Sequence, residues 1–143
     1  MENSMTLRFL ALSRNESFAR AVASAFFAQL DPTLAELADL KTAVSEAVTN
    51  CVVHAYGDDA PKNYITLTMT MTENEATVVI EDTGRGIEDI EKARLPFFTT
   101  APGEERSGMG FSVMEAFMDS LIVESSLGKG TRVTMTKRVG EQK

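Results

Sequence analysis

The stretch from residue 64 to residue 71 alternates apolar and polar side chains without interruption. The apolar set is Ile65, Leu67, Met69 and Met71, and the other set is Tyr64, Thr66, Thr68 and Thr70. Successive side chains of a β-strand point to opposite faces of a sheet, so this strand has one face on a core and the other in contact with water. The fold therefore requires a sheet that is covered on one face only.

The remaining periodicities predict the elements around this strand. Strands are expected at 5–11, 76–81, 121–125 and 131–136, and helices after residues 13 and 33, at 89–93 and after residue 110. The order β-α-α-β-β-loop-α-β-β predicts an α+β fold: a two-layer α/β sandwich with a mixed, mostly antiparallel sheet and helices on one face. A single domain over residues 1–143 is expected, with a disordered tail at 140–143.

Two capping boxes mark the first two helices. Ser13 and Glu16 form one, and Thr33 and Glu36 form the other. The inner face of the first helix is predicted to consist of Phe18, Val22, Ala25, Phe26 and Gln29 or Leu30. The second helix is predicted to be long and to end within the stretch 45–56.

Composition and charge exclude several classes of function. The net charge of −7 argues against direct binding of nucleic acid, which requires a basic surface, and it suits a partner that is itself basic. A single cysteine cannot form an internal disulfide, and one cysteine with one histidine cannot build a His/Cys metal cluster. No segment is typical of a membrane span or a signal peptide, so a cytoplasmic protein is expected.

Three polar residues follow one another at intervals of four near the end of the second helix. Glu46, Asn50 and His54 share one helix face, which borders the apolar stripe. A carboxylate there could act as a general base, and the Asn50 oxygen could hold a hydrated Mg²⁺ ion. A solvated polar edge on a core helix is the alternative interpretation, and His54 fits a hydrogen-bonded residue at the helix end.

Glycine pairs follow a strand and precede a helix. Asp82, at a strand end, is followed by Gly84 and Gly86, and it could either accept a hydrogen bond from the amine of adenine or cap the turn. Gly108 and Gly110 lead into a helix whose N-terminus could bind phosphate. Between these pairs lies the long loop 96–106, and long loops in compact domains are often functional.

Taken together and in this order, four segments resemble the N, G1 and G2 boxes and the late threonine segment of the GHKL ATPase/kinase superfamily. They are 46–54, 82–86, 108–110 and 129–131. The stretches 45–50, 96–100 and 105–111, with the short chain, are most similar to the anti-sigma F family of endospore-forming bacteria.

This resemblance implies a homodimeric serine protein kinase that uses ATP, releases ADP and requires Mg²⁺. It implies two protein partners: the sporulation sigma factor F, sequestered when ATP is bound, and a STAS-type anti-anti-sigma protein that is phosphorylated on serine. An anti-sigma B type of stress-response kinase, or a nucleotide-gated sigma-binding protein without phosphotransfer, are the alternatives.

The resemblance also implies roles for individual residues. Glu46 would be the general base, Asn50 the Mg²⁺ ligand, and Asp82 the adenine-binding residue. Arg106 would contact the γ-phosphate, and Arg20 a protein partner. The other nucleotide contacts would come from Gly84, Gly86, Thr99, Thr100, Ser107, Gly108, Met109, Gly110 and Thr131.

Overall fold

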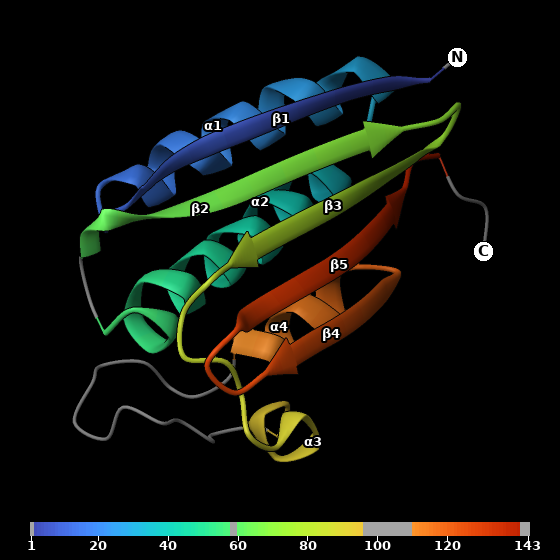
Figure 1. Ribbon diagram of the computed structural model, residues 1–143. Coiled ribbons are helices and arrows are strands. Elements are labelled where there is room, and N and C mark those ends of the chain that lie inside the picture. Colours follow the sequence, from blue (N-terminus) through green and yellow to red (C-terminus); the bar gives the residue numbers. More distant parts are fainter. Residues whose placement is uncertain (1, 58–59, 96–109, 141–143) are drawn as a thin grey trace.

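In the part of the chain that the structure describes, five strands form one sheet, and helices α1, α2 and α4 lie on the same side of it (Figure 1). The computed structural model describes residues 2–57, 60–95 and 110–140. The elements are β1 (Asn3–Ala11), α1 (Asn15–Phe27), a 3₁₀ turn (Ala28–Leu30), α2 (Leu34–Asn50), a π-helical segment (Cys51–Ala55), β2 (Ala60–Met71), β3 (Glu75–Asp82), α3 (Ile90–Ala93), α4 (Gly110–Phe117), β4 (Ser120–Ser126) and β5 (Gly130–Arg138). The predicted two-layer α+β architecture is confirmed.

The strand order is β1-β2-β3-β5-β4, and each of these neighbouring pairs is antiparallel. The strands β2 and β3 form one hairpin, and β4 and β5 form another. Because β5 lies next to β3, the end of β3 meets the start of β5, and Asp82 pairs with Thr131. Sheet topology therefore joins two motifs that are far apart in the sequence.

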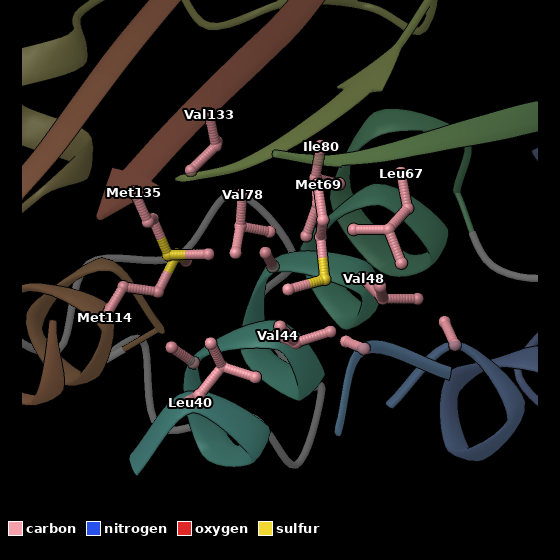
Figure 2. Packing of buried hydrophobic residues seen from close by; sticks show 14 of the residues in the cluster. Leu40, Val44, Val48, Leu67, Met69, Val78, Ile80, Met114, Val133 and Met135 are labelled. Carbon is pink, nitrogen blue, oxygen red and sulfur yellow. The ribbon is translucent and has the colours of Figure 1, made fainter. Parts of the chain in front are cut away.

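The alternation in β2 produces the two faces that the sequence predicts. Its four apolar side chains are buried, and Thr66, Thr68 and Thr70 on the other face are partly exposed. Figure 2 shows the core between the layers, where side chains of the sheet meet those of α2 and α4. The labelled residues are Leu67, Met69, Val78, Ile80, Val133 and Met135 from the sheet, and Leu40, Val44, Val48 and Met114 from the helices.

Helix α1 differs from its prediction in both start and phase. Its N-cap residue is Arg14 rather than Ser13, and that residue makes no side-chain cap hydrogen bond. Its buried residues are Ala19, Ala23, Phe26 and Phe27. Phe18 is 50% exposed, and of the expected inner face Phe26 alone is buried. The buried alanines, which carry small side chains, allow α1 to pack closely on α2, and this tertiary contact decides the phase.

Helix α2 begins as predicted and ends earlier. The Glu36 N–H donates to Thr33 Oγ1 at 3.1 Å and the Thr33 N–H donates to Glu36 Oε1 at 2.8 Å, which is a complete capping box. The α-helical hydrogen bonding stops at Asn50, and a π-helical segment follows, closed by a 3.2 Å bond from the Tyr56 N–H to the Cys51 carbonyl. A wider turn of this kind often occurs at functional sites.

Two of the predictions concern segments at the edges of the described ranges. The loop 96–106 and residues 141–143 of the expected tail lie outside the residues that the structure describes. Gly140 is described, and its N–H donates to Glu36 Oε2 at 3.0 Å. The described chain therefore ends in contact with the capped start of α2.

Candidate functional site

A cavity of about 910 Å³ lies at one end of the helical layer. Its lining comes from the end of α2 with its π-helical segment, the turn after β3, α3, the start of α4 and the β4–β5 hairpin. Seven residues proposed from the sequence motifs are among those that line it: Glu46, Asn50, His54, Asp82, Gly86, Gly110 and Thr131. The fold thus brings the separate motifs to one site.

The end of α2 contributes the polar wall of this cavity. Glu46 and Asn50 are partly buried and lie one α-helical turn apart, as their spacing predicts. His54 also lines the cavity, from the π-helical segment rather than from a continuing α-helix. The polar face of α2 is therefore directed into a cavity.

Gly110, the first residue of α4, lies against Asn50. A Cβ atom at Gly110 would be 3.0 Å from Asn50 Oδ1 and 3.1 Å from Asn50 Nδ2, closer than nearly all real Cβ contacts. The absence of a side chain lets the start of α4 approach the amide. A helix N-terminus presents unbonded N–H groups and a partial positive charge, so this arrangement can place an anionic group beside Asn50.

Asp82 forms the deepest polar group of the site. Among the described residues it is the one buried side chain that carries a charge, with 8% of its surface exposed. The Gly84 N–H donates to Asp82 Oδ1 at 2.9 Å, and the backbone of Thr131 and the Cys51 side chain also hydrogen-bond to this carboxyl. Burial raises the pKa of Asp82, and these three hydrogen bonds oppose that rise. A buried carboxylate in a cavity can accept a hydrogen bond from a ligand amine.

The turn after Asp82 lies between the π-helical segment and the β4–β5 hairpin. Both approach its backbone so closely that there is no space for a side chain at Gly84 or Gly86. A Cβ atom on Gly84 would collide with the Ala55 carbonyl oxygen, and one on Gly86, where φ is +79°, would collide with the Ser126 carbonyl oxygen. The Arg85 N–H donates to the Ala55 carbonyl at 3.1 Å. The π-helical segment therefore fixes the position of the turn.

Thr131 belongs to a small hydroxyl network that sequence reasoning missed. Its Oγ1 lies 2.8 Å from Ser125 Oγ, which also accepts a 2.7 Å hydrogen bond from the Ile87 N–H. Ser125 thereby ties the β4–β5 hairpin to the turn after β3. Ser125 is the residue that was missed. The predicted β4–β5 hairpin was the signal for it, because the register of that hairpin pairs Ser125 with Thr131.

Arg20 is the one described candidate that lies elsewhere. It is on α1, 3.2 Å from Glu16 and 3.1 Å from Ser45 Oγ, and its side chain is 39% exposed. The Ser45 hydroxyl also donates to Glu16. This cluster connects α1 to the residue that precedes Glu46. The candidates Thr99, Thr100, Arg106, Ser107, Gly108 and Met109 lie outside the described residues.

The donor set of the cavity suits a magnesium ion that is bound mainly through a ligand. Over residues 2–57, 60–95 and 110–140, no three His, Cys, Asp or Glu side chains gather as a metal site. Asn50 offers a hard oxygen, and Mg²⁺ in proteins often keeps several waters and binds substrate phosphates. In the described part of the chain, no helix combines the length and the apolarity needed to cross a bilayer.

Comparison with known proteins agrees with this arrangement. A model of the histidine kinase-like ATPase domain family matches residues 9–137. The chain is 57% identical over 141 residues to an anti-sigma F factor of Caldanaerobacter subterraneus subsp. tengcongensis, covering 99% of this chain and 97% of that one. It is 50% identical over 143 residues to an anti-sigma F factor of Geobacillus kaustophilus, covering 100% of this chain and 97% of that one.

A solved structure shares the fold. It is the crystal structure of the RsbU and RsbW domains of Rv1364c from Mycobacterium tuberculosis, with a TM-score of 0.69 and 21% identity. The match covers 96% of this chain and 32% of that one, and at this identity the likeness concerns the fold. The family model and the near full-length relatives show that this chain belongs to the histidine kinase-like ATPase family and, within it, to the anti-sigma F factors.

Proposed function

We propose that this protein is an ATP-dependent kinase that phosphorylates a serine of a STAS-type anti-anti-sigma protein and sequesters sigma factor F. One observation carries the nucleotide part of this proposal: Glu46, Asn50 and Asp82, from two separate motifs, line one cavity. The names of its relatives, anti-sigma F factors, support the sigma factor as a partner.

The base of the nucleotide would bind at the buried end of the cavity, and the burial of the Asp82 carboxylate there supports this. Asp82 would accept a hydrogen bond from the exocyclic amine of adenine, while Thr131 and the Gly84 N–H hold that carboxylate in place. The phosphates would then extend toward Asn50 and the start of α4, where Gly110 leaves room for close approach.

Phosphoryl transfer needs a group that accepts the proton of the attacking hydroxyl. Glu46 lies one helical turn from Asn50, so its carboxylate would take the proton from the serine hydroxyl as the serine oxygen bonds to the γ-phosphorus and ADP leaves. Asn50 would hold the Mg²⁺ ion, which neutralises charge on the phosphates when bound. Arg106 would contact the γ-phosphate, because planar arginine donors suit phosphate oxygens.

The names of the relatives support a sigma factor as one protein partner, and the homodimer is part of this proposal. We expect a homodimer that binds sigma factor F when ATP is present and releases it after phosphoryl transfer, since loss of the γ-phosphate changes the charge that a surrounding loop can contact. Arg20, partly exposed on α1, is the proposed partner contact on the described surface. Its bond to Ser45, beside Glu46, supports a connection between that surface and the cavity.

The experiment that tests this proposal is transfer of label from γ-labelled ATP to a purified STAS partner and to sigma factor F, with Mg²⁺ and with EDTA. We expect label on a serine of the STAS protein that depends on Mg²⁺ and falls at least about 100-fold in Glu46→Gln, the lower end of general-base effects. ATP binding and sigma capture should persist in that variant. Glu36→Gln is the matched control, because it makes the same chemical change at the other end of α2 and glutamine still completes a capping box.

Three results would contradict parts of this proposal. Equal label transfer by wild type and Glu46→Gln would remove Glu46 as the base. ATP-dependent capture of a sigma factor without any label would leave a nucleotide-gated binding protein. Label transfer to a STAS protein together with capture of a stress-response sigma factor alone would indicate the anti-sigma B type.

A further inference from the structure

Ser125 lies on β4, on the face of the strand that the helical layer covers. It shares this face with the buried Val123, and it lines the cavity together with Thr131. Ser125 pairs with Thr131 across the β4–β5 hairpin, and Thr131 pairs with Asp82 across β5 and β3. The three residues therefore form one row across three neighbouring strands, and the row ends at the buried carboxylate.

The Ser125 hydroxyl makes three hydrogen bonds, which is all that a hydroxyl can make. Its oxygen accepts from the Ile87 N–H at 2.7 Å, and it lies 2.9 Å from the Gly130 carbonyl oxygen and 2.8 Å from Thr131 Oγ1. A hydroxyl has one proton and two lone pairs. Because a carbonyl oxygen can only accept, the Ser125 proton goes to Gly130, and the third bond requires Thr131 to be the donor.

This direction determines what Thr131 presents to the cavity. Its proton is directed to Ser125, so its oxygen offers lone pairs to a ligand. Asp82, directly opposite on β3, is also an acceptor and receives the Gly84 N–H at 2.9 Å. Residues that face each other on antiparallel strands have Cβ atoms about 4.5–5.5 Å apart. The Asp82 and Thr131 side chains thus present two neighbouring acceptors to a ligand.

Ser125 also holds the turn after β3 against the hairpin. Its bond from the Ile87 N–H is accompanied by a 2.7 Å bond from the Gly128 N–H to the Arg85 carbonyl. Figure 1 shows this region, where the turn between β4 and β5 lies beside the chain that leads from β3 to α3. One hydroxyl therefore fixes both a wall of the cavity and the direction of the Thr131 hydroxyl.

We propose that Ser125 is a positioning residue that sets the purine selectivity of the cavity. By taking the proton of Thr131, it makes Thr131 and Asp82 a pair of acceptors. This pair suits the exocyclic amine of adenine, which carries two hydrogens, and it disfavours the carbonyl oxygen that inosine and guanosine nucleotides carry at the same position. The inference rests on the proposed function, which assigns adenine to Asp82, and it adds a selectivity residue on the β4–β5 hairpin.

Calorimetric titration with ADP and with inosine diphosphate, at neutral pH and with Mg²⁺, tests this proposal. The measured quantity is the ratio of the two dissociation constants, which does not change when part of the protein is unfolded, because both nucleotides bind the same folded state. Ser125→Ala frees the Thr131 hydroxyl to turn and donate to a carbonyl oxygen. We expect the preference for ADP to fall about fivefold, the size of one modest hydrogen bond.

A double-mutant cycle separates this role from a merely structural one. Thr131→Val replaces the hydroxyl with a methyl group of similar shape, so Ser125 has no hydroxyl left to orient. In that background, Ser125→Ala should change the preference for ADP by less than about twofold, the usual limit of additivity between independent sites. A structural effect of Ser125 would instead change the preference equally in both backgrounds.

The same hairpin offers a matched control. Ser120 and Thr136 also pair in the β4–β5 register, and their hydroxyl oxygens lie 2.6 Å apart. Neither residue lines the cavity. Ser120→Ala therefore removes a contact of the same chemistry from the same two strands, and it should leave the preference for ADP unchanged.

The outcomes distinguish this inference from the function on which it rests. If wild type fails to bind ADP, both are wrong. If wild type binds ADP and inosine diphosphate equally well, the assignment of the amine to Asp82 and this inference are wrong, whereas nucleotide binding stands. If wild type prefers ADP and Ser125→Ala has the same preference, the positioning role alone is wrong. Equal losses with Thr131 and with Thr131→Val, or a loss in Ser120→Ala, would indicate a general effect of the hairpin and overturn the inference.

Discussion

The two ends of helix α2 satisfy their free backbone groups in opposite ways. At the start, Thr33 and Glu36 bond to each other's backbone N–H groups within four residues. At the other end, the helix widens into the π-helical segment, and the Ala55 carbonyl accepts a hydrogen bond from the Arg85 N–H of a distant turn. The first end is closed by local sequence, whereas the second is closed by tertiary contacts.

Tyr56 strengthens this contrast. Its hydroxyl donates to the Tyr64 carbonyl at 2.9 Å and accepts from the Thr83 N–H at 2.8 Å. It therefore joins the end of the helical layer to β2 and to the residue that follows Asp82. An end that is built from distant segments can position a ligand between them, and a change in any one of these segments alters the site. The locally capped end should contribute stability alone.

The largest expected effect is at the functional end. Gly84→Ala introduces a Cβ atom that collides with the carbonyl oxygen and the side chain of Ala55. Either the backbone of the turn at Gly84 or that of the π-helical segment must therefore move. We expect a loss of about 2–3 kcal/mol in the free energy of unfolding, typical of overpacking, and weaker ADP binding because the Asp82 turn shifts. Urea denaturation and calorimetry measure both quantities.

Gly140→Ala is the matched control for that substitution. Gly140 has a φ of +62°, and a Cβ atom there meets nothing within 4 Å, so strain of about 1 kcal/mol is expected without any change in ADP affinity. If the two variants lost equal stability and Gly84→Ala bound ADP normally, close packing of the turn against Ala55 would not position the site.

A smaller effect is expected at the capped end. Thr33→Ala removes the acceptor for the Glu36 N–H and should lower the free energy of unfolding by about 1 kcal/mol, leaving ADP affinity unchanged. Thr42→Ala provides the comparison within the same helix, because the Thr42 hydroxyl bonds back to the Ala38 carbonyl and its loss should alter stability by less than about 0.5 kcal/mol. Reduced ADP affinity in Thr33→Ala would show that the two ends of α2 are coupled.

The smallest effect concerns pH and again the functional end. The pKa of Asp82 is raised in the folded state, so its contribution to stability is greatest below the ordinary pKa of aspartate and declines as pH rises through the folded-state value. Asparagine does not titrate. The free energy of unfolding of wild type minus that of Asp82→Asn should therefore decrease with rising pH and then become constant. Denaturation curves at several pH values would contradict this if the difference were constant or increased.

Local sequence patterns predicted the faces of the sheet and the start of α2, but not the start or the phase of α1. The alternation at 64–71 predicted the two faces of β2, and Thr33 with Glu36 predicted the start of α2, because both signals involve neighbours in the chain. The phase of α1 was wrong, since Phe18 and Ala19 are adjacent and only the close contact with α2 selects the alanine as the buried one. The N-cap at Arg14 was also missed, and the Asn15 side chain, at the start of α1, donates to the Leu10 carbonyl of β1 at 2.9 Å, a contact that the capping-box pattern does not reveal.

The candidate site divides in the same way. Glu46, Asn50, Asp82 and Gly110 were predicted from short motifs, and each lines the cavity. Ser125 and Cys51 were not predicted as site residues, because their partners, Thr131 and Asp82, are reached through strand pairing and through the π-helical turn. Residue spacing within one segment does not reveal such contacts.

The sequence alone determined which side chains are available as candidates for the chemistry and which face of the sheet is buried, because side-chain type and short-range periodicity are properties of adjacent residues. Tertiary structure alone decided that β5 pairs with β3, which sets Thr131 against Asp82, and that α2 widens at Cys51, which sets a thiol against the same carboxylate. The strand pairing and the widening of the helix both depend on how the helical layer packs against the sheet. The free energy of that packing is summed over the whole core and is not a property of adjacent residues.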